Sequence, residues 1–151
     1  MAEEEKWITP EKETDLFKLT RTDYISGAHK LPNHQGKCAK MHGHNWKVVS
    51  EITGTLCNNP KDPEFGMVVD FGVIKGIIDE FDHKIINDLV PNPTAELIAR
   101  NIAFRIMLAR LRISSVLITI WETENSSVQY LATESDRKVT LDVELSDATS
   151  K

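Results

Sequence analysis

Hydrophobic and polar residues alternate most regularly over residues 42–56, and this alternation predicts a β-strand with one buried face. One parity of the segment is mostly polar, and the other carries Trp46, Val48, Ile52 and Leu56. Side chains two positions apart on a strand point to the same face. If the strand begins by residue 42, the imidazoles of His42 and His44 therefore continue its buried row.

Four other segments have the composition of strands. Residues 15–26 contain Phe, Thr, Tyr and Ile in an imperfect alternation, and residues 114–122 are rich in β-branched side chains. Residues 127–133 follow a short turn and are the expected hairpin partner of residues 114–122. Residues 138–145 alternate cleanly and are a candidate for an extra edge strand.

Two helices are predicted between these pairs of strands. Asp70 is placed to cap the first helix, because apolar residues follow it at helical spacing: Phe71, Ile74, Ile77, Ile78 and Phe81. The second helix is expected to begin with Asn92 as its cap, Pro93 at the first helical position and Glu96 near the first turn. The order β-β-α-α-β-β implies an α+β fold, an antiparallel sheet with both helices on one face.

Length and composition suit one domain. The chain has 151 residues, of which 40% are hydrophobic and 27% charged. We expect an acidic flexible tail over residues 1–14, a single domain over residues 15–134 and a C-terminal extension over residues 135–151. No apolar run approaches the roughly 20 residues of a membrane helix, so no membrane association is expected. The acidic N-terminus lacks the features of a signal peptide, which predicts a cytoplasmic location with both cysteines as thiols.

Charge is distributed unevenly along the chain. The net charge is −5, and nucleic acid is therefore not an expected partner. Residues 24–50 nevertheless contain no Asp or Glu, while four lysines occur there: Lys30, Lys37, Lys40 and Lys47. The segment is either an ordinary solvated basic loop or a local positive field that attracts an anionic small molecule.

The histidines of the buried row predict a metal site. His42 and His44, two positions apart on a strand, can both reach one ion, and His29 near the end of the first strand is the best third ligand. His34 lies in the intervening loop and is less constrained. Neutral imidazoles suit zinc, and three protein ligands leave one coordination position open for a reacting molecule.

Two other interpretations of this motif stay open. The His-Gly-His sequence could be a turn with two surface histidines, because short motifs also occur by chance. Cys38, four residues before His42, could be a fourth ligand in a closed structural site. Against that, Cys38 belongs to the loop after Gly36 rather than to the strand, and its basic surroundings favour a reactive thiolate.

Two acidic positions are further candidates. Asp82 and His83 are adjacent, and a carboxylate can orient an imidazole for proton transfer if the pair faces the metal. Otherwise the pair is only a helix cap and a surface residue. Glu122 has the parity of the buried row of residues 116–120, and its two oxygens could accept paired N–H donors from a flat heterocycle. The simpler interpretation is a glutamate that points into solvent at the end of a strand.

Several segments, taken together and in order, resemble one enzyme family. They are AHKLP with His29, GKCAKMHGHNW, GMVVDF, FDHKIIND, NPTAE and WETENSSVQY. The chain is similar over residues 17–130 to the family of 6-pyruvoyltetrahydropterin synthase and 6-carboxytetrahydropterin synthase. The resemblance implies a tunnelling fold, a four-stranded antiparallel sheet with two helices. It also implies that the sheets of three subunits close into a barrel, and that two trimers form a homohexamer with active sites between subunits.

The resemblance also implies roles for individual residues. The zinc ligands would be His29, His42 and His44. Cys38 would abstract a proton without binding the metal, and Asp82 with His83 would complete the proton relay. Glu122 would anchor the pterin, and Thr94 would also touch it. The implied substrate is 7,8-dihydroneopterin triphosphate, which loses its triphosphate by elimination.

Within the family, the spacing of Cys38 to the His-Gly-His motif resembles the bacterial carboxy type. That type forms 6-carboxy-5,6,7,8-tetrahydropterin, releases acetaldehyde and supplies queuosine synthesis. Formation of 6-pyruvoyltetrahydropterin and a non-catalytic zinc-stabilised binding module are the alternatives. Two features depart from the pattern: Lys84 follows His83 where some members have a second histidine, and the segment after residue 134 extends past the usual end.

Overall fold

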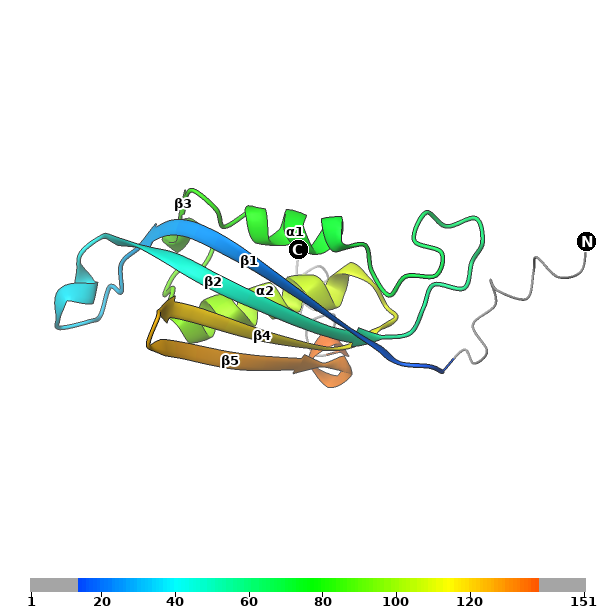
Figure 1. Cartoon of the computed structure of the whole chain (residues 1–151). Coiled ribbons are helices and arrows are strands. Elements are labelled where there is room, and N and C mark those ends of the chain that lie inside the picture. Colours follow the sequence, from blue (N-terminus) through cyan, green and yellow to red (C-terminus); the bar gives the residue numbers. More distant parts are fainter. Residues whose placement is uncertain (1–13, 139–151) are drawn as a thin grey trace, which may run out of the picture.

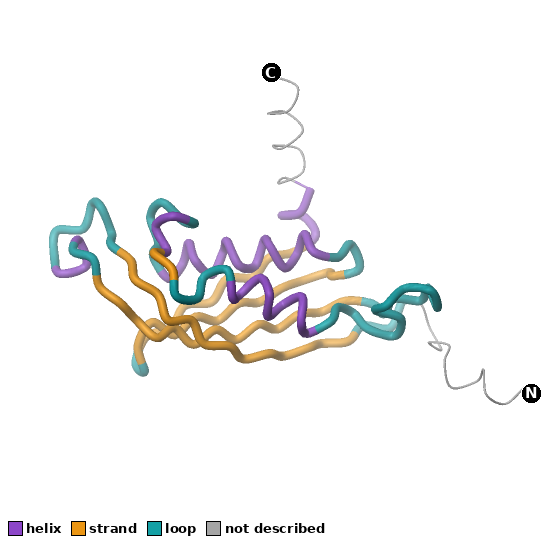
Figure 2. Tube along the Cα trace, turned by 90° about the horizontal axis from the view of Figure 1, so that it is seen from above, coloured by secondary structure: helices purple, strands orange, loops and turns teal. Residues whose placement is uncertain are grey.

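The computed structural model describes residues 14–138, which form a twisted sheet with helices on one face (Figures 1 and 2). The strands lie in the order β3-β1-β2-β4-β5. Their bounds are β1 Phe17–His29, β2 His42–Gly54, β3 Lys84–Ile85, β4 Ile113–Thr123 and β5 Ser126–Thr133. The α+β class and the helices on one face are confirmed. Residues 1–13 of the predicted acidic tail and residues 139–145 of the predicted extra strand lie outside the described residues, and Lys138 itself is helical.

The prediction of a four-stranded, wholly antiparallel sheet is wrong. A fifth strand, the two-residue β3, pairs with β1 in parallel at Gly27 and Ala28, so the sheet is mixed. The preceding turn is bound to the edge of β1, because Ser26 donates its N–H to Asp82 and accepts the N–H of His83. Gly27 permits this close approach, since a Cβ there would lie 2.9 Å from Cδ1 of Ile86.

The register of β1 and β2 decides which ends of the strands meet. The two strands are antiparallel over their whole length, from Phe17 opposite Gly54 to His29 opposite His42. β1 runs three residues beyond the segment predicted from sequence, and those residues include His29. Two of the predicted ligands therefore lie side by side at one end of the sheet.

The helices begin and end near the predicted positions, with two differences. Helix α1, Phe71–Asp79, starts as predicted, because the side chain of Asp70 accepts the N–H of Gly72 at 2.6 Å. It ends before Asp82 and His83, which lie in the following turn and not at the helix end as expected. Helix α2, Ala95–Ala109, is capped by Thr94 and not by Asn92. The Thr94 hydroxyl accepts the N–H of Leu97, which satisfies a free donor of the first turn.

The hydrophobic core lies between the sheet and the two helices. Trp46, Val48 and Ile52 are almost completely buried, as their shared parity predicts. Helix α2 covers β4 and β5, while α1 packs near β1. Two short 3-10 helices, η2 (Lys37–Ala39) and η3 (Ile86–Asp88), occur in the connections. None of the helices among residues 14–138 is long and apolar enough to cross a membrane.

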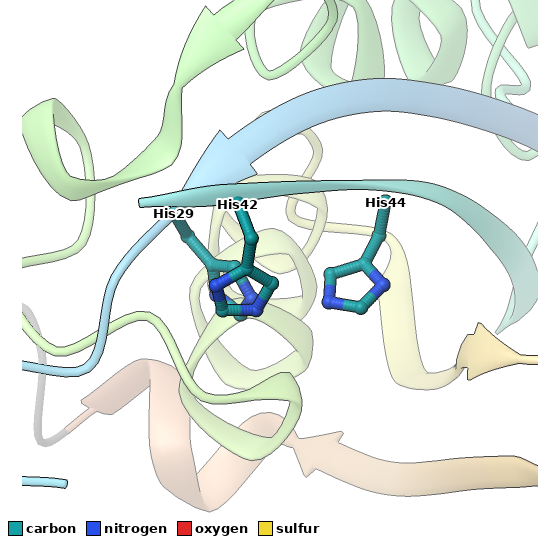
Figure 3. A group of neighbouring side chains, drawn as sticks. All are labelled: His29, His42 and His44. Atoms are coloured by element: carbon teal, nitrogen blue, oxygen red, sulfur yellow. The ribbon is translucent and has the colours of Figure 1, made fainter. Parts of the chain in front are cut away.

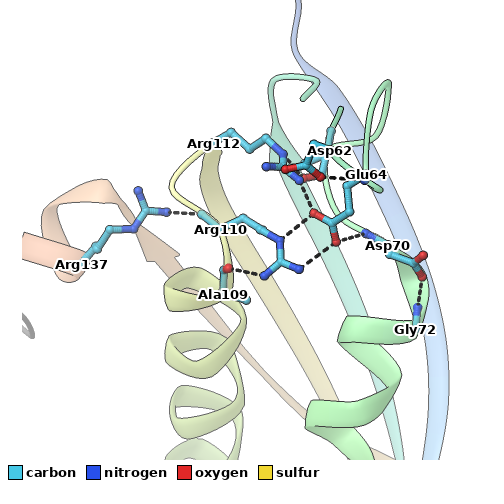
Figure 4. Close-up of polar contacts among 9 residues, drawn as sticks. Asp62, Glu64, Asp70, Gly72, Ala109, Arg110, Arg112 and Arg137 are labelled. Carbon is cyan, nitrogen blue, oxygen red and sulfur yellow. Dashed lines mark hydrogen bonds and ion pairs between the residues drawn. The ribbon is translucent and has the colours of Figure 1, made fainter. Parts of the chain in front are cut away.

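A buried carboxylate joins three segments at the opposite end of the sheet from the histidines (Figure 4). Glu64 accepts two N–H groups of Arg110, at 2.6 and 2.9 Å, another from Arg112, and the backbone N–H of Asp70 at 3.1 Å. These bonds, foremost the one from Arg110, lower the pKa of Glu64 to about 2. Glu64 therefore fixes the β2–α1 connection to the end of α2 and to the cap of α1.

A second buried polar group ends helix α2. The guanidinium of Arg137 is nearly buried and donates to four backbone carbonyls, those of Met107, Arg110, Leu111 and Ile113. The carbonyl of Met107 belongs to the last turn of α2, where carbonyls have no partner within the helix, and the other three lie at or beyond its end. Arg137 belongs to residues 134–138, which are helical and start the expected C-terminal extension. The extension thus begins as an anchored element of the domain.

We expect the Glu64→Gln variant to be less stable at pH 7 by about 3 kcal/mol, because two guanidinium groups lose their charged acceptor. The folded-state pKa is depressed, so this stability is present above the ordinary pKa of 4.5 and is lost as pH falls toward 2. The wild type should therefore lose more stability than the variant between pH 5 and about pH 2. Urea unfolding at several pH values measures both effects.

Asp79→Asn is the matched control for this experiment. Asp79 forms an exposed ion pair with Lys75, and its removal should change the free energy of unfolding by about 0.5 kcal/mol or less. Equal losses in the two variants, or equal pH dependence of wild type and Glu64→Gln, would show that Glu64 does not join these segments.

Candidate metal centre and active site

Three histidine side chains converge at the end of β1 and β2 (Figure 3). His29 is the last residue of β1, and His42 and His44 belong to the first three residues of β2. One nitrogen from each ring lies within 4.8 Å of the corresponding nitrogens of the other two. The ring centroids of His29 lie 4.5 Å from His42 and 5.2 Å from His44. The structure thus brings together all three predicted metal ligands.

Hydrogen bonds fix the tautomer of two of these rings. Nδ1 of His29 lies 2.7 Å from the carbonyl oxygen of Pro93, and Nδ1 of His42 lies 2.7 Å from that of Lys40. A carbonyl oxygen can only accept, so each Nδ1 carries the hydrogen and each Nε2 has a free lone pair. A backbone carbonyl that orients an imidazole in this way is the usual second partner of a metal-ligating histidine.

The remaining nitrogens lack the partners that buried polar atoms normally have. Nε2 of both His29 and His44 is buried and has no hydrogen-bond partner among the described residues. Burial lowers the pKa of His44, although Glu122 opposes the shift, and this favours the neutral form that binds metals. Unsatisfied buried nitrogens are costly, and a divalent ion that accepts imidazole ligands would satisfy them. The three residues therefore fit a metal ion.

Glu122 lies beside this group. Its Oε1 is 3.4 Å from Nε2 of His44 and 3.6 Å from Nε2 of His29, and about a third of the side chain is exposed. The pairing of β4 with β5 is irregular between Trp121 and Thr123, so Glu122 has no partner across the hairpin. Such bulges commonly redirect a side chain next to a site. The carboxylate is thus aimed at the metal centre, but it can also reach a ligand bound there.

Cys38 does not join the group of mutually close ligand atoms, which consists of the three histidines. It is partly buried in η2, between Lys37 and Ala39. Its carbonyl oxygen accepts the N–H of Leu31 at 2.8 Å, which closes the loop between β1 and β2. Cys38 therefore lies in the connection between β1 and β2, the two strands that carry the histidines, four residues before His42.

Asp82 and His83 form a defined pair at the edge of the sheet. One oxygen of Asp82 accepts the N–H of Ser26 at 2.8 Å, and the other lies 3.0 Å from Nδ1 of His83. These bonds, first the one from Ser26, lower the pKa of Asp82 and keep it ionised. His83 has a left-handed backbone, with φ of 54°, and its side chain is 81% exposed. The imidazole thus projects into solvent with Nε2 free.

The pair does not contact the histidine triad of its own chain in any interaction that the structure gives. His83 lines a groove of about 510 Å³ with Ser26, Gly27, Ala28, Gly43, His44, Asn45, Lys84 and Ile85. Neither His29 nor His42 contributes to that groove. His83 therefore shares a groove with one of the three predicted ligands, and the relay of Cys38, Asp82 and His83 stays a prediction.

Thr94 has a clear structural position. It caps α2, and its neighbour Pro93 supplies the carbonyl that orients His29. Trp46 was not predicted as part of the site, yet its ring centroid lies 4.9 Å from that of His29 and 5.1 Å from that of His44. The parity that Trp46 shares with His42 and His44 was a signal for this contact. No sequence signal identifies the carbonyls of Pro93 and Lys40.

Comparison with known proteins identifies the family. The family model of 6-pyruvoyl tetrahydropterin synthase matches residues 18–133. The 6-carboxy-5,6,7,8-tetrahydropterin synthase of Haemophilus influenzae is 34% identical over 143 residues, covering 76% of this chain and 99% of that protein. A putative 6-carboxy-5,6,7,8-tetrahydropterin synthase of Archaeoglobus fulgidus is 44% identical over 86 residues, 54% of this chain. The latter match spans 65% of the archaeal protein, slightly less than two thirds of its length.

A solved structure shares the fold. The 6-pyruvoyl tetrahydropterin synthase of Caenorhabditis elegans superposes with a TM-score of 0.60 at 23% identity, covering 81% of this chain and 99% of that one. The family match covers most of the chain and includes every residue of the candidate site. The chain therefore belongs to the 6-pyruvoyl tetrahydropterin synthase family.

Proposed function

We propose that this protein is a zinc-dependent lyase that converts 7,8-dihydroneopterin triphosphate and one water molecule to 6-carboxy-5,6,7,8-tetrahydropterin, acetaldehyde and triphosphate. The observation that carries the proposal is the convergence of His29, His42 and His44, with ligand atoms within 4.8 Å of one another. The names of the relatives from Haemophilus influenzae and Archaeoglobus fulgidus support the carboxy product over other products of the family. The pathway that such a product would supply is queuosine synthesis.

Different residues of the candidate site would bind the metal, orient its ligands and bind the pterin. Bound zinc would act as a Lewis acid toward the hydroxyl groups of the substrate side chain. The carbonyls of Pro93 and Lys40 hold two ligand rings in the required tautomer. Glu122 would accept the paired N–H groups of the pterin edge, and Thr94 would support the ring from the start of α2. Trp46 excludes water from the buried side of the centre.

Proton transfer falls to Cys38, Asp82 and His83. Asp82 is ionised and holds the hydrogen of His83 on Nδ1, which leaves Nε2 free to take up or deliver a proton. Cys38 would abstract a proton from the substrate side chain as a thiolate. Because the side chain of His83 is 81% exposed, we propose that the pair of Asp82 and His83 serves the centre of a neighbouring subunit in a homohexamer of two trimers.

The second candidate is 6-pyruvoyltetrahydropterin synthase. This is the activity named in the description of the matching family and in that of the C. elegans structure. It would use the same substrate and the same ligands. Its product retains all side-chain carbons, so no acetaldehyde appears.

A cytoplasmic location stays a prediction from the sequence.

The decisive experiment is incubation of the purified protein with 7,8-dihydroneopterin triphosphate and identification of all products. We expect 6-carboxy-5,6,7,8-tetrahydropterin, acetaldehyde and triphosphate, and we expect a chelator to abolish turnover until zinc is restored. Mass spectrometry and trapping of acetaldehyde measure this result. A 6-pyruvoyl product without acetaldehyde would favour the second candidate, and no turnover with bound zinc would favour a binding module.

Cys38→Ala should retain zinc and fold but lower turnover at least about 100-fold, because a proton-transfer group contributes about that much or more. Cys57→Ala is the control, since Cys57 is the other thiol and lies in the connection after β2. It should keep its turnover and lose only some stability. Loss of zinc from Cys38→Ala would instead make Cys38 a ligand of a closed site.

Glu122→Gln should weaken pterin binding about 10-fold or more, because a hydrogen bond to a charged group contributes roughly 1.5–3 kcal/mol. Its zinc content should stay that of the wild type. Glu124→Gln, on the same hairpin, is the matched control and should change neither property. Lower zinc content in Glu122→Gln would identify the carboxylate as a metal ligand, as its distances of 3.4 and 3.6 Å from two ligand nitrogens would allow.

A further inference from the structure

A cavity with aromatic residues lies on the face of the sheet that the helices leave open (Figure 2). Side chains alternate between the two faces of a strand, and His42, His44 and Trp46 point to the face covered by the helices. Asn45 and Lys47 therefore point to the open face. The cavity there has a volume of about 600 Å³, and six residues line it: Tyr24, Asn45, Lys47, Trp121, Thr123 and Glu124.

The register of three strands brings the aromatic residues to this cavity. Tyr24 on β1 lies opposite Lys47 on β2, and Lys47 lies opposite Trp121 on β4. The three side chains therefore form one row across adjacent strands, with the lysine in the middle. Neighbouring strands are about 4.8 Å apart, so the two aromatic residues are separated by about 10 Å. A planar ring between them would lie about 5 Å from each, within the range of stacked aromatic pairs.

Both aromatic rings are available for a ligand. Tyr24 is 66% exposed, and Trp121 is half-buried. The ring contacts of residues 14–138 join other aromatic residues and include neither Tyr24 nor Trp121. Ligand sites are commonly lined by aromatic side chains together with a few polar groups. The row therefore has the composition of a site for a flat ligand.

The polar groups of the cavity are available as well. Lys47 and Glu124 are exposed, and neither forms an ion pair in the part of the chain that the structure describes. Oδ1 of Asn45 accepts the hydroxyl hydrogen of Ser26 at 2.9 Å, which leaves the amide N–H groups of Asn45 to donate. Glu124 lies in the turn between β4 and β5, while Lys47 lies further into the sheet, opposite Trp121. The cavity thus offers a cation in the aromatic row and an acceptor at its end.

We propose that this cavity binds a nucleotide, with the base between Tyr24 and Trp121 and the phosphate on Lys47. Bases stack on aromatic side chains, lysine binds phosphate oxygens, and the carboxylate of Glu124 accepts an N–H group of the base. A free nucleotide fits better than a nucleic acid strand, because the cavity holds one lysine and the chain has a net charge of −5. The inference does not depend on the proposed function, since none of the six residues belongs to the metal centre.

Calorimetric titration of the full chain with adenosine monophosphate tests the site. We expect the wild type to bind, and Tyr24→Leu and Trp121→Leu each to weaken binding about 10-fold, because they remove one stacking partner of the base. Lys47→Gln should weaken binding about 3-fold through the lost charge. Trp121→Phe and Lys47→Arg keep the ring and the charge and should retain most of the affinity. Adenosine and ribose 5-phosphate should each bind more weakly than the nucleotide, because each lacks one of its two groups.

Two controls separate this cavity from the rest of the sheet and from the metal centre. Leu131→Thr removes an exposed apolar side chain from the same face, opposite Leu117 and outside the cavity, and should leave the affinity unchanged. Glu122→Gln should bind adenosine monophosphate as the wild type does, because adenine lacks the paired N–H edge that Glu122 would accept. The proposal is overturned if the wild type does not bind, if neither aromatic variant weakens binding, or if Glu122→Gln abolishes it.

Tryptophan fluorescence locates the bound base. The chain has three tryptophans, Trp7, Trp46 and Trp121, and stacking on Trp121 should quench part of the emission. Trp121→Phe should bind the nucleotide without this quenching, and undiminished quenching in that variant would overturn the proposal. An oligoadenylate that binds more tightly per nucleotide than adenosine monophosphate would also overturn it, in favour of a surface for single-stranded nucleic acid.

Discussion

The register between β1 and β2 is the constraint on which the candidate site depends. His29 lies directly opposite His42, and His44 follows on the same face of β2. A slip of one residue would turn the side chains of one strand to the other face of the sheet and separate the ligands. The slip is opposed by the core, because Ile25 on β1 and Trp46 and Val48 on β2 are buried on that same face. Core packing and metal geometry are therefore specified by one pattern of alternation.

The connection between α1 and α2 holds the ends of these strands from the other side. The Asp82–His83 turn binds Ser26, Asn87 binds Lys30, and the carbonyl of Pro93 binds His29. These contacts are spaced along the last residues of β1 and the first residue after it. They make the end of the strand rigid where ligand directions must be accurate, and they place β3 in the sheet. The left-handed His83, which costs about 1–2 kcal/mol, persists because both of its neighbours in the turn are bonded.

Much of this arrangement follows from the sequence. The parity of residues 42–56 predicted the buried row and placed two ligands on it, and the third ligand followed from its position near the end of the preceding strand. The cap of α1 was also predictable, whereas the cap of α2 is Thr94 and not the expected Asn92, because the Thr94 hydroxyl accepts the N–H of Leu97. The two-residue β3 could not be predicted, since its pairing results from tertiary contacts of Asp82 and His83. The parity of a residue on a strand predicts which face of the sheet its side chain points to. It does not predict which backbone carbonyls bind that side chain, such as those of Pro93 and Lys40, because these contacts depend on how other segments pack.

The energetics of the triad favour a metal ion over a structural role for the histidines. His29 and His42 use Nδ1 to bond backbone carbonyls, so these two Nδ1–H groups are not available to join the rings to one another. Two of these nitrogens are buried without partners, and each such loss costs roughly 1–3 kcal/mol. Protonation would add a donor, but burial and the neighbouring rings oppose a charge on His44. A fold selected only for stability would replace such residues by apolar ones, as it has done along the rest of the row at Trp46, Val48 and Ile52. The Nε2 atoms without hydrogen-bond partners thus lower the stability of the metal-free fold. The hydrophobic core beside them supplies enough stability to tolerate this loss, and metal binding is what the arrangement serves.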